Sequence, residues 1–300
     1  MNIKSILAVT DFSMAAEQGL ERAALLAARH QAKLRIIYGA EVPNLGLADP
    51  MARLQQRGRQ LARRHSTPVE VIGNTSNMLD DLSRHARSAN LLVVDHRSER
   101  SLSAFWRGTT LDQLLRRCPC PLLIVKQEPQ ENYKRIMVAI DGTVQPQRLV
   151  QFASGVEVHS ELEVFHSFEA LNIPESNGGA QSNDALRVHR RAARPDGLRR
   201  AIRFSDYFET RRNRVTSLTG RRSEPAREIA AHQNFAQSDL IVVGNQRRST
   251  LADFLFGNVA GRLTNLASSD VLVFPHDYQA PSGALATDRI QTLLNRQRPV

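Results

Sequence analysis

The apolar residues of this chain fall into short continuous runs that are separated by longer, partly polar segments. In the first part of the chain five runs have the length of a buried strand: 4–9, 34–38, 69–72, 91–94 and 122–125. Four segments between them predict helices: 14–31, 51–65, 78–87 and 110–117. Continuous apolar strands that alternate with helices are typical of a parallel sheet covered on both faces. The pattern therefore predicts a doubly wound α/β domain with a five-stranded sheet.

The same pattern occurs a second time along the chain. Residues 3–13 match residues 133–143 at an offset of 130, and residues 89–110 match residues 238–259 at an offset of 149. The difference, 149 minus 130, places 19 additional residues in the first half of the second copy. We therefore predict two tandem domains and a C-terminal tail: 1–130, 131–278 and 279–300.

Doubly wound sheets bind ligands beyond the carboxyl ends of their strands, where the strand order reverses. Asp11 and Asp141 follow the first strand of each copy. Both suit hydrogen bonds within the following turn as well as a ligand role, so the two alternatives stay open. The stretch GNQRRSTLADFLFGNVAG at 244–261 follows the fourth strand of the second copy and runs into a predicted helix. A strand, a glycine-bounded loop and a helix N-terminus form an arrangement that holds phosphate.

Three features of the sequence together resemble the universal stress protein family in its tandem two-domain form. They are a V-A-x-D type of turn after the first strand, the late loop with its helix, and the closing strand of the type CPCPLLIV at 118–125. The resemblance covers residues 1–126 and 133–276. It implies two Rossmann-like domains whose last strands, 122–125 and 271–274, pair antiparallel within one chain and close a pseudo-dimer. It also implies a stress-response regulator or binding module, with further oligomerisation left open.

In nucleotide-binding members of that family the late loop reads glycine, two residues, glycine, nine residues, glycine, and then Ser or Thr. The resemblance implies that the glycines admit backbone amides to the phosphates and that the first-strand Asp lies near the nucleoside. Copy one has Asp95 and Ser98 at the first two glycine positions, followed by Gly108 and Thr109 at the last pair. Asp95 adds negative charge beside a phosphate, which opposes binding unless an arginine or a cation compensates. Gly108 and Thr109 also fit an ordinary turn and N-cap.

Copy two is the better phosphate candidate because it keeps two of the three glycines. Gly244 and Gly257 match the family, whereas Arg247 replaces the middle glycine and Asn258 the hydroxyl residue. Arg247 closes the backbone approach, yet its guanidinium is able to hold a phosphate directly. Gly257 and Asn258 also fit a turn and an N-cap without any ligand. We hypothesise that this loop keeps its shape without being a high-affinity ATP site, so ATP or another small anion is the candidate ligand.

No catalytic pattern accompanies these loops. The sequence contains no G-x-x-x-x-G-K-[ST] and no G-x-S-x-G, and no G-x-G-x-x-G opens either copy. His96 and His166 lie at strand ends, where a metal site is an alternative to an ordinary solvated or core histidine. Cys118 and Cys120 predict packing before the last strand of copy one rather than a disulfide or a zinc site. We predict a protein without enzymatic activity, and a nucleotide-hydrolysing or nucleotide-sensing enzyme is the alternative.

Charge adds a second candidate surface. Of the 40 Lys and Arg residues only four are lysine, and the net charge of +10 favours acidic partners. Twelve of the arginines lie within residues 183–222, where residues 195–208 predict a helix. The stretch from Arg187 to Arg222 is either an arginine-coated solvent face or a weak polyanion-binding face for nucleic acid, acidic protein or a membrane surface.

The sequence predicts no membrane span. None of its apolar runs approaches the roughly 18 residues that a membrane helix needs. The N-terminal stretch MNIKSILAVTDFS differs from a signal peptide because its apolar part is short and Asp11 interrupts it. We therefore expect a cytoplasmic location.

Overall fold

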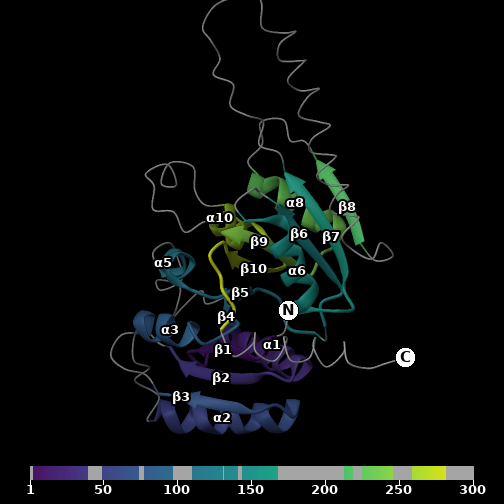
Figure 1. Cartoon of the computed structure of the whole chain (residues 1–300). Coiled ribbons are helices and arrows are strands. Elements are labelled where there is room, and N and C mark those ends of the chain that lie inside the picture. The colour runs from purple at the N-terminus through teal and green to yellow at the C-terminus, as the bar shows by residue number, and fades with distance from the viewer. Residues whose placement is uncertain are drawn as a thin grey trace, which may run out of the picture.

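Strands and helices alternate through the first half of the chain, as predicted (Figure 1). The computed structural model describes residues 3–39, 49–73, 78–96, 110–130, 132–140, 144–167, 213–218, 225–245 and 259–281. The first half contains β1 (Ser5–Thr10), α1 (Met14–His30), β2 (Lys33–Tyr38), α2 (Pro50–His65), β3 (Val69–Ile72), α3 (Met78–Ala86), β4 (Leu91–Asp95), α5 (Thr110–Arg117) and β5 (Leu122–Val125). All nine predicted elements are present, with boundaries that agree within one residue.

The second half also contributes five strands, one of which the apolar pattern did not predict. It contains β6 (Arg135–Ile140), α6 (Pro146–Val156), β7 (Glu161–Ser167), β8 (Asn213–Leu218), α8 (Pro225–Ala236), β9 (Leu240–Asn245), α10 (Val259–Leu266) and β10 (Asp270–Pro275). Strand β8 lies within the arginine-rich stretch, and only Val215 and Leu218 of its residues are apolar. The rest of the stretch from Arg187 to Arg222, including the predicted helix at 195–208, lies outside the described residues.

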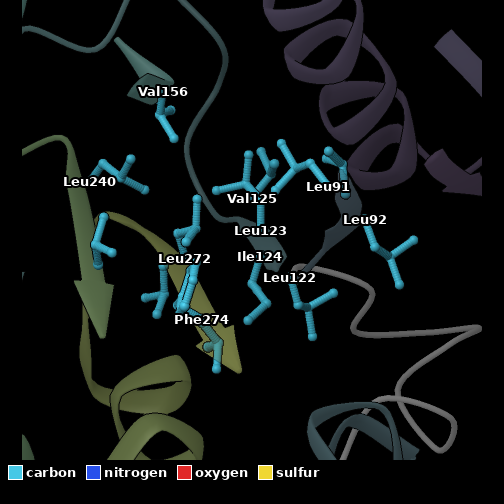
Figure 2. Packing of buried hydrophobic residues seen from close by; sticks show 14 of the residues in the cluster. Leu91, Leu92, Leu122, Leu123, Ile124, Val125, Val156, Leu240, Leu272 and Phe274 are labelled. Atoms are coloured by element: carbon cyan, nitrogen blue, oxygen red, sulfur yellow. The ribbon is translucent and has the colours of Figure 1, made fainter. Parts of the chain in front are cut away.

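All ten strands form one continuous sheet. Its order is β3-β2-β1-β4-β5-β10-β9-β6-β7-β8, so each half contributes five parallel strands. The halves join where β5 and β10 pair antiparallel, with Leu123 opposite Leu272. Figure 2 shows the apolar side chains of β5 beside Leu272 and Phe274 of β10, and both strands are buried along their whole length. The predicted tandem α/β fold and the predicted pairing of the last strands are confirmed, and this pairing covers two sheet edges.

The direction of the chain in each half sets where the helices and the ligand position lie. Strands β1, β2 and β3 follow one another outward, and β4 then returns to the other side of β1. Because parallel crossovers are right-handed, α1 and α2 cover one face of the sheet and α3 and α5 the other. Consistently, α1 packs against α2, and α3 packs against α5. The strand order therefore reverses between β1 and β4, and between β6 and β9.

The two cysteines pack before β5, as their spacing predicts. Cys118 and Cys120 are buried, and their Sγ atoms lie 3.7 Å apart without a disulfide. The Sγ atom of Cys118 also lies 3.3 Å from the carbonyl oxygen of Cys120. Both residues therefore behave as small apolar packing residues.

Polar contacts join the two halves beyond the shared sheet. Arg29 of α1 forms an ion pair with Glu157, which follows α6. On the other side, Asn245 of β9 donates from Nδ2 to the carbonyl oxygen of Leu115 in α5, at 2.7 Å. The two domains are therefore held together by side chains as well as by the β5–β10 ladder.

Matching residues of the repeat hold the start of the first strand in each half. Asn90 Oδ1 accepts hydrogen bonds from the N–H groups of Lys4 and Ser5, at 2.9 and 3.0 Å. Asp239, which is 149 residues later, accepts from the two equivalent N–H groups of the second half through Oδ2, at 2.6 and 2.9 Å. Each side chain thus satisfies two backbone donors where the first strand begins beside the fourth.

Asn90→Ala is expected to lower the free energy of unfolding by about 1–3 kcal/mol, because it leaves two backbone donors without their acceptor. Asn90 is only 3% exposed, so water replaces the lost acceptor poorly. Urea denaturation followed by circular dichroism measures the change. Asp239→Asn is the matched control, because its amide oxygen still accepts both bonds, and we expect it to be nearly neutral. Equal losses in the two variants would contradict this interpretation.

Candidate functional site

The β1–α1 turn holds Asp11 at the carboxyl end of the first strand. Oγ1 of Thr10 accepts from the N–H of Phe12 at 3.0 Å, and Oδ1 of Asp11 accepts from the N–H of Ser13 at 2.8 Å. Oγ of Ser13 in turn accepts from the N–H of Ala16 at 3.1 Å and caps α1. The turn role that was one of two alternatives for Asp11 is therefore present.

An aromatic residue in an unusual backbone conformation fixes this turn. Phe12 has a φ of 66°, in the left-handed region that bulky residues rarely adopt. Its ring stacks on Tyr38 with 5.2 Å between the centroids, and the Arg53 guanidinium lies 4.6 Å from the ring centroid. Packing of the ring between these two side chains stabilises the conformation, which keeps Asp11 at the strand end.

Asp95 is the last residue of β4 and lies across the reversal point from β1. Val93 pairs with Ala8, and this register places Asp95 beside the end of β1. Helix α1 approaches so closely that a Cβ added at Gly19 would lie 3.7 Å from Asp95 Cβ. Asp95 is 4% exposed, and within the described part of the chain its Oδ2 is buried without a hydrogen-bond partner.

The carboxyl group of Asp11 affects that of Asp95 at this reversal point. Burial, and then the negative charge of Asp11, raise the pKa of Asp95 from 3.8 to about 7. A phosphate at the end of β4 would therefore meet desolvated negative charge. The arrangement opposes an anion in the first domain, and it accommodates a proton or a cation.

The second domain has no carboxyl group at the matching position. Gly244 is 149 residues after Asp95, lies in the fully buried strand β9 and pairs with Phe274. The residue after it, Asn245, is occupied by its hydrogen bond to the first half of the chain. The two reversal points therefore differ by a carboxyl side chain on one side and no side chain on the other.

Part of the predicted site lies outside the described residues: Ser98, Gly108, Thr109, Asp141, Arg247, Gly257 and Asn258. The structure places Asp11, Asp95 and Gly244, and it brings the first two together. Their proximity is what the predicted fold implies, because the residues that end the first and fourth strands become neighbours in a doubly wound sheet.

Among the described residues we find no metal-binding cluster of three ligands and no membrane-spanning helix. Burial, followed by the charge of Lys126, lowers the pKa of His96, which contacts the backbone of Thr264 and the side chain of Asn265. No group of three or more His, Cys, Asp or Glu side chains in this part of the chain is placed to hold a metal ion. His166 belongs to β7, and its side chain is outside the described part. No described helix is both long and apolar enough to span a bilayer.

Comparison with known sequences matches both copies of the repeat. The model of the universal stress protein family matches residues 2–126 and 132–275. A universal stress protein of Synechocystis sp. is 21% identical over 231 residues, which make up 77% of this chain and 71% of that protein.

Solved structures share the fold over nearly the whole chain. A functionally unknown protein from Pseudomonas aeruginosa PAO1 matches with a TM-score of 0.66 and 21% identity, covering 92% of this chain and 93% of that one. A universal stress protein from Archaeoglobus fulgidus matches with a TM-score of 0.60 and 16% identity, covering 91% and 97%. These similarities concern the fold, and a fold alone does not define a ligand.

Proposed function

Because the chain belongs to the universal stress protein family, we propose that it is a binding or regulatory protein of the stress response. In this proposal the second domain holds a phosphate-bearing or other small anionic ligand beyond the end of β9. The ligand is held and released without chemical conversion.

The difference between the two reversal points supports this assignment. In the first domain Asp95 and Asp11 concentrate negative charge where a ligand of this fold would lie. In the second domain Gly244 contributes no charge and no side chain at the matching position. Bringing a phosphate beside the additional buried carboxyl group of Asp95 costs free energy, whereas Gly244 at the matching position does not carry that cost.

The neighbourhood of Gly244 also favours an anion. Helix α10 follows the same loop, and the N-terminus of a helix carries partial positive charge with unsatisfied N–H groups. The sequence between the strand and this helix includes Arg247 and Arg248. Arginine offers paired donors that match phosphate oxygens. Contacts from arginines at a surface are screened by salt, so we expect weak, salt-sensitive binding.

Calorimetric titration of the whole chain with ATP and with sulfate, at low and high salt, tests the proposal. We expect one weak anion site per chain, little preference for ATP over sulfate, and an affinity that falls steeply as salt is added. Gly257→Val is expected to abolish the site, because a branched side chain closes the backbone approach. Chromatography of the titrated sample is expected to show unchanged ATP.

Arg247→Gly sharpens this test. Restoring a glycine opens the backbone approach, so we expect ATP affinity to rise more than sulfate affinity. Two equal sites, or tight and salt-insensitive ATP binding, would contradict the proposal. Formation of ADP would instead favour the nucleotide-hydrolysing alternative.

A further inference from the structure

The first domain contains a buried carboxylate oxygen that no described group satisfies. Oδ2 of Asp95 has no hydrogen-bond partner in the part of the chain that the structure describes, and the whole residue is 4% exposed. A buried charge without a partner is costly, and native proteins pair such groups or use them to bind metal ions. An unsatisfied buried polar atom in a native fold therefore indicates a bound water, ion or ligand.

This oxygen lies at the ligand position of the fold. Strands β1 and β4 are neighbours at the reversal point, and Asp95 ends β4 while Asp11 follows β1. The negative charge of Asp11 acts on Asp95 across this point. Two carboxyl groups therefore lie at the ends of neighbouring strands, at the point where open doubly wound sheets bind their ligands.

Among the described residues, a basic side chain beside this turn contacts an aromatic ring. Arg53 lies over the ring of Phe12, 4.6 Å from its centroid. The N–H of Ser13 donates to Oδ1 of Asp11, at 2.8 Å. These contacts leave the Oδ2 atom of Asp95 without a described counter-charge.

We propose that this point of the first domain is a divalent-cation site and that Mg²⁺ is the ion of best fit. Mg²⁺ prefers oxygen ligands and keeps several of its waters, and in many sites one or two carboxylates are its only protein ligands. Asp95 Oδ2 supplies a direct oxygen ligand, and Asp11 supplies the second negative charge beside it. The proposal concerns the first domain alone and requires no anion in the second.

Calorimetric titration of the whole chain with MgCl₂, in nucleotide-free buffer at about pH 8 where carboxyl groups are ionised, tests the proposal. We expect one Mg²⁺ site per chain. Asp95→Asn is expected to weaken it by at least about tenfold, because even residues that only orient metal ligands contribute that much. Glu128→Gln is the matched control, since it removes an exposed carboxyl group and is expected to leave Mg²⁺ binding unchanged.

Thermal unfolding with and without Mg²⁺ provides a second readout. A ligand that binds only the folded state raises the unfolding midpoint, so Mg²⁺ is expected to raise it for the wild type and not for Asp95→Asn. Absence of Mg²⁺ binding at millimolar concentration, or unchanged binding in Asp95→Asn, would overturn the proposal. Titration with methylguanidinium chloride tests an organic cation at the same point. Binding of this ion, with no binding of Mg²⁺, would overturn the choice of a metal. The sulfate titration of the second domain is independent of all these outcomes.

Discussion

Asp270→Ala is expected to lower the free energy of unfolding by about 3–5 kcal/mol, the loss that follows removal of one partner from a buried ion pair. Asp270 begins β10 and is completely buried. Groups from the first helix and from the segment that connects the halves contact its carboxylate. The loss therefore falls on the junction between the two domains.

Four groups converge on this carboxylate. Arg22 of α1 forms an ion pair with it, with Nε 3.5 Å from Oδ2, and the hydroxyl of Tyr133 donates to Oδ2 at 2.6 Å. The N–H groups of Lys126 and Gln127 donate to Oδ1, at 2.8 and 3.0 Å. The Arg22 guanidinium also lies 4.2 Å from the centroid of the Tyr133 ring. Burial raises the pKa of Asp270, and the charge of Arg22 opposes that rise. The ionised form of Asp270 therefore depends on Arg22.

Urea denaturation of Asp270→Ala measures the predicted loss. Glu70→Ala is the matched control, because Glu70 forms an exposed ion pair. Its Oε2 atom lies 2.7 Å from Nζ of Lys33, and the side chains of Glu70 and Lys33 are 43% and 55% exposed. We expect the control to lose less than about 1 kcal/mol. Arg22→Met in the Asp270→Ala background is expected to recover part of the loss, because it removes a buried charge that has lost its ion pair with Asp270. A loss in Asp270→Ala no larger than that of the control would contradict the role at the junction.

Asp95→Asn is expected to stabilise the protein above about pH 7 by up to about 4 kcal/mol, and to change its stability little near pH 4. The pKa of Asp95 is about 7 in the folded protein, against 3.8 as its ordinary value. Between these values the folded state binds the proton and the unfolded state does not. The contribution of Asp95 to stability is therefore lost as the pH rises through this window.

Asparagine keeps the shape of the side chain and removes this titration. The difference between the unfolding free energies of Asp95→Asn and the wild type is thus expected to grow from about pH 4 to about pH 7 and then to level off. Urea denaturation across this range, with EDTA present to exclude bound cations, measures it. Glu128→Gln, at an exposed carboxyl group, is expected to show no such trend. A difference independent of pH would show that folding does not raise the pKa of Asp95.

The first domain was predictable in detail because its strands are continuous apolar runs with helical segments between them. Strand β8 was not predictable in the same way, since NRVTSL mixes polar and apolar residues at the edge of the sheet. The family resemblance predicted the junction of β5 and β10. It did not predict Asp270, because Pro121 occupies the matching position of the first copy and the contact with Arg22 forms only in the folded chain.

The sequence predicted where in the fold the candidate site lies, but only part of the charge and burial of its side chains. The loop comparison identified Asp95 as a charge that opposes phosphate. It did not indicate that Oδ2 would be buried without a partner, because burial depends on the close approach of α1 at Gly19. The turn around Asp11 depends on the packing of Phe12 between Tyr38 and Arg53, which no local pattern encodes.

The most direct test of this account exchanges the residues that differ between the two reversal points. The variants are Gly244→Asp and Asp95→Gly, and both side chains fit the fold because each occupies the matching position in the other copy. Sulfate titration by calorimetry is the measurement. The account predicts one anion site in the wild type, none in Gly244→Asp, and no loss of binding in Asp95→Gly. Anion binding that survives Gly244→Asp, or disappears in Asp95→Gly, would contradict it.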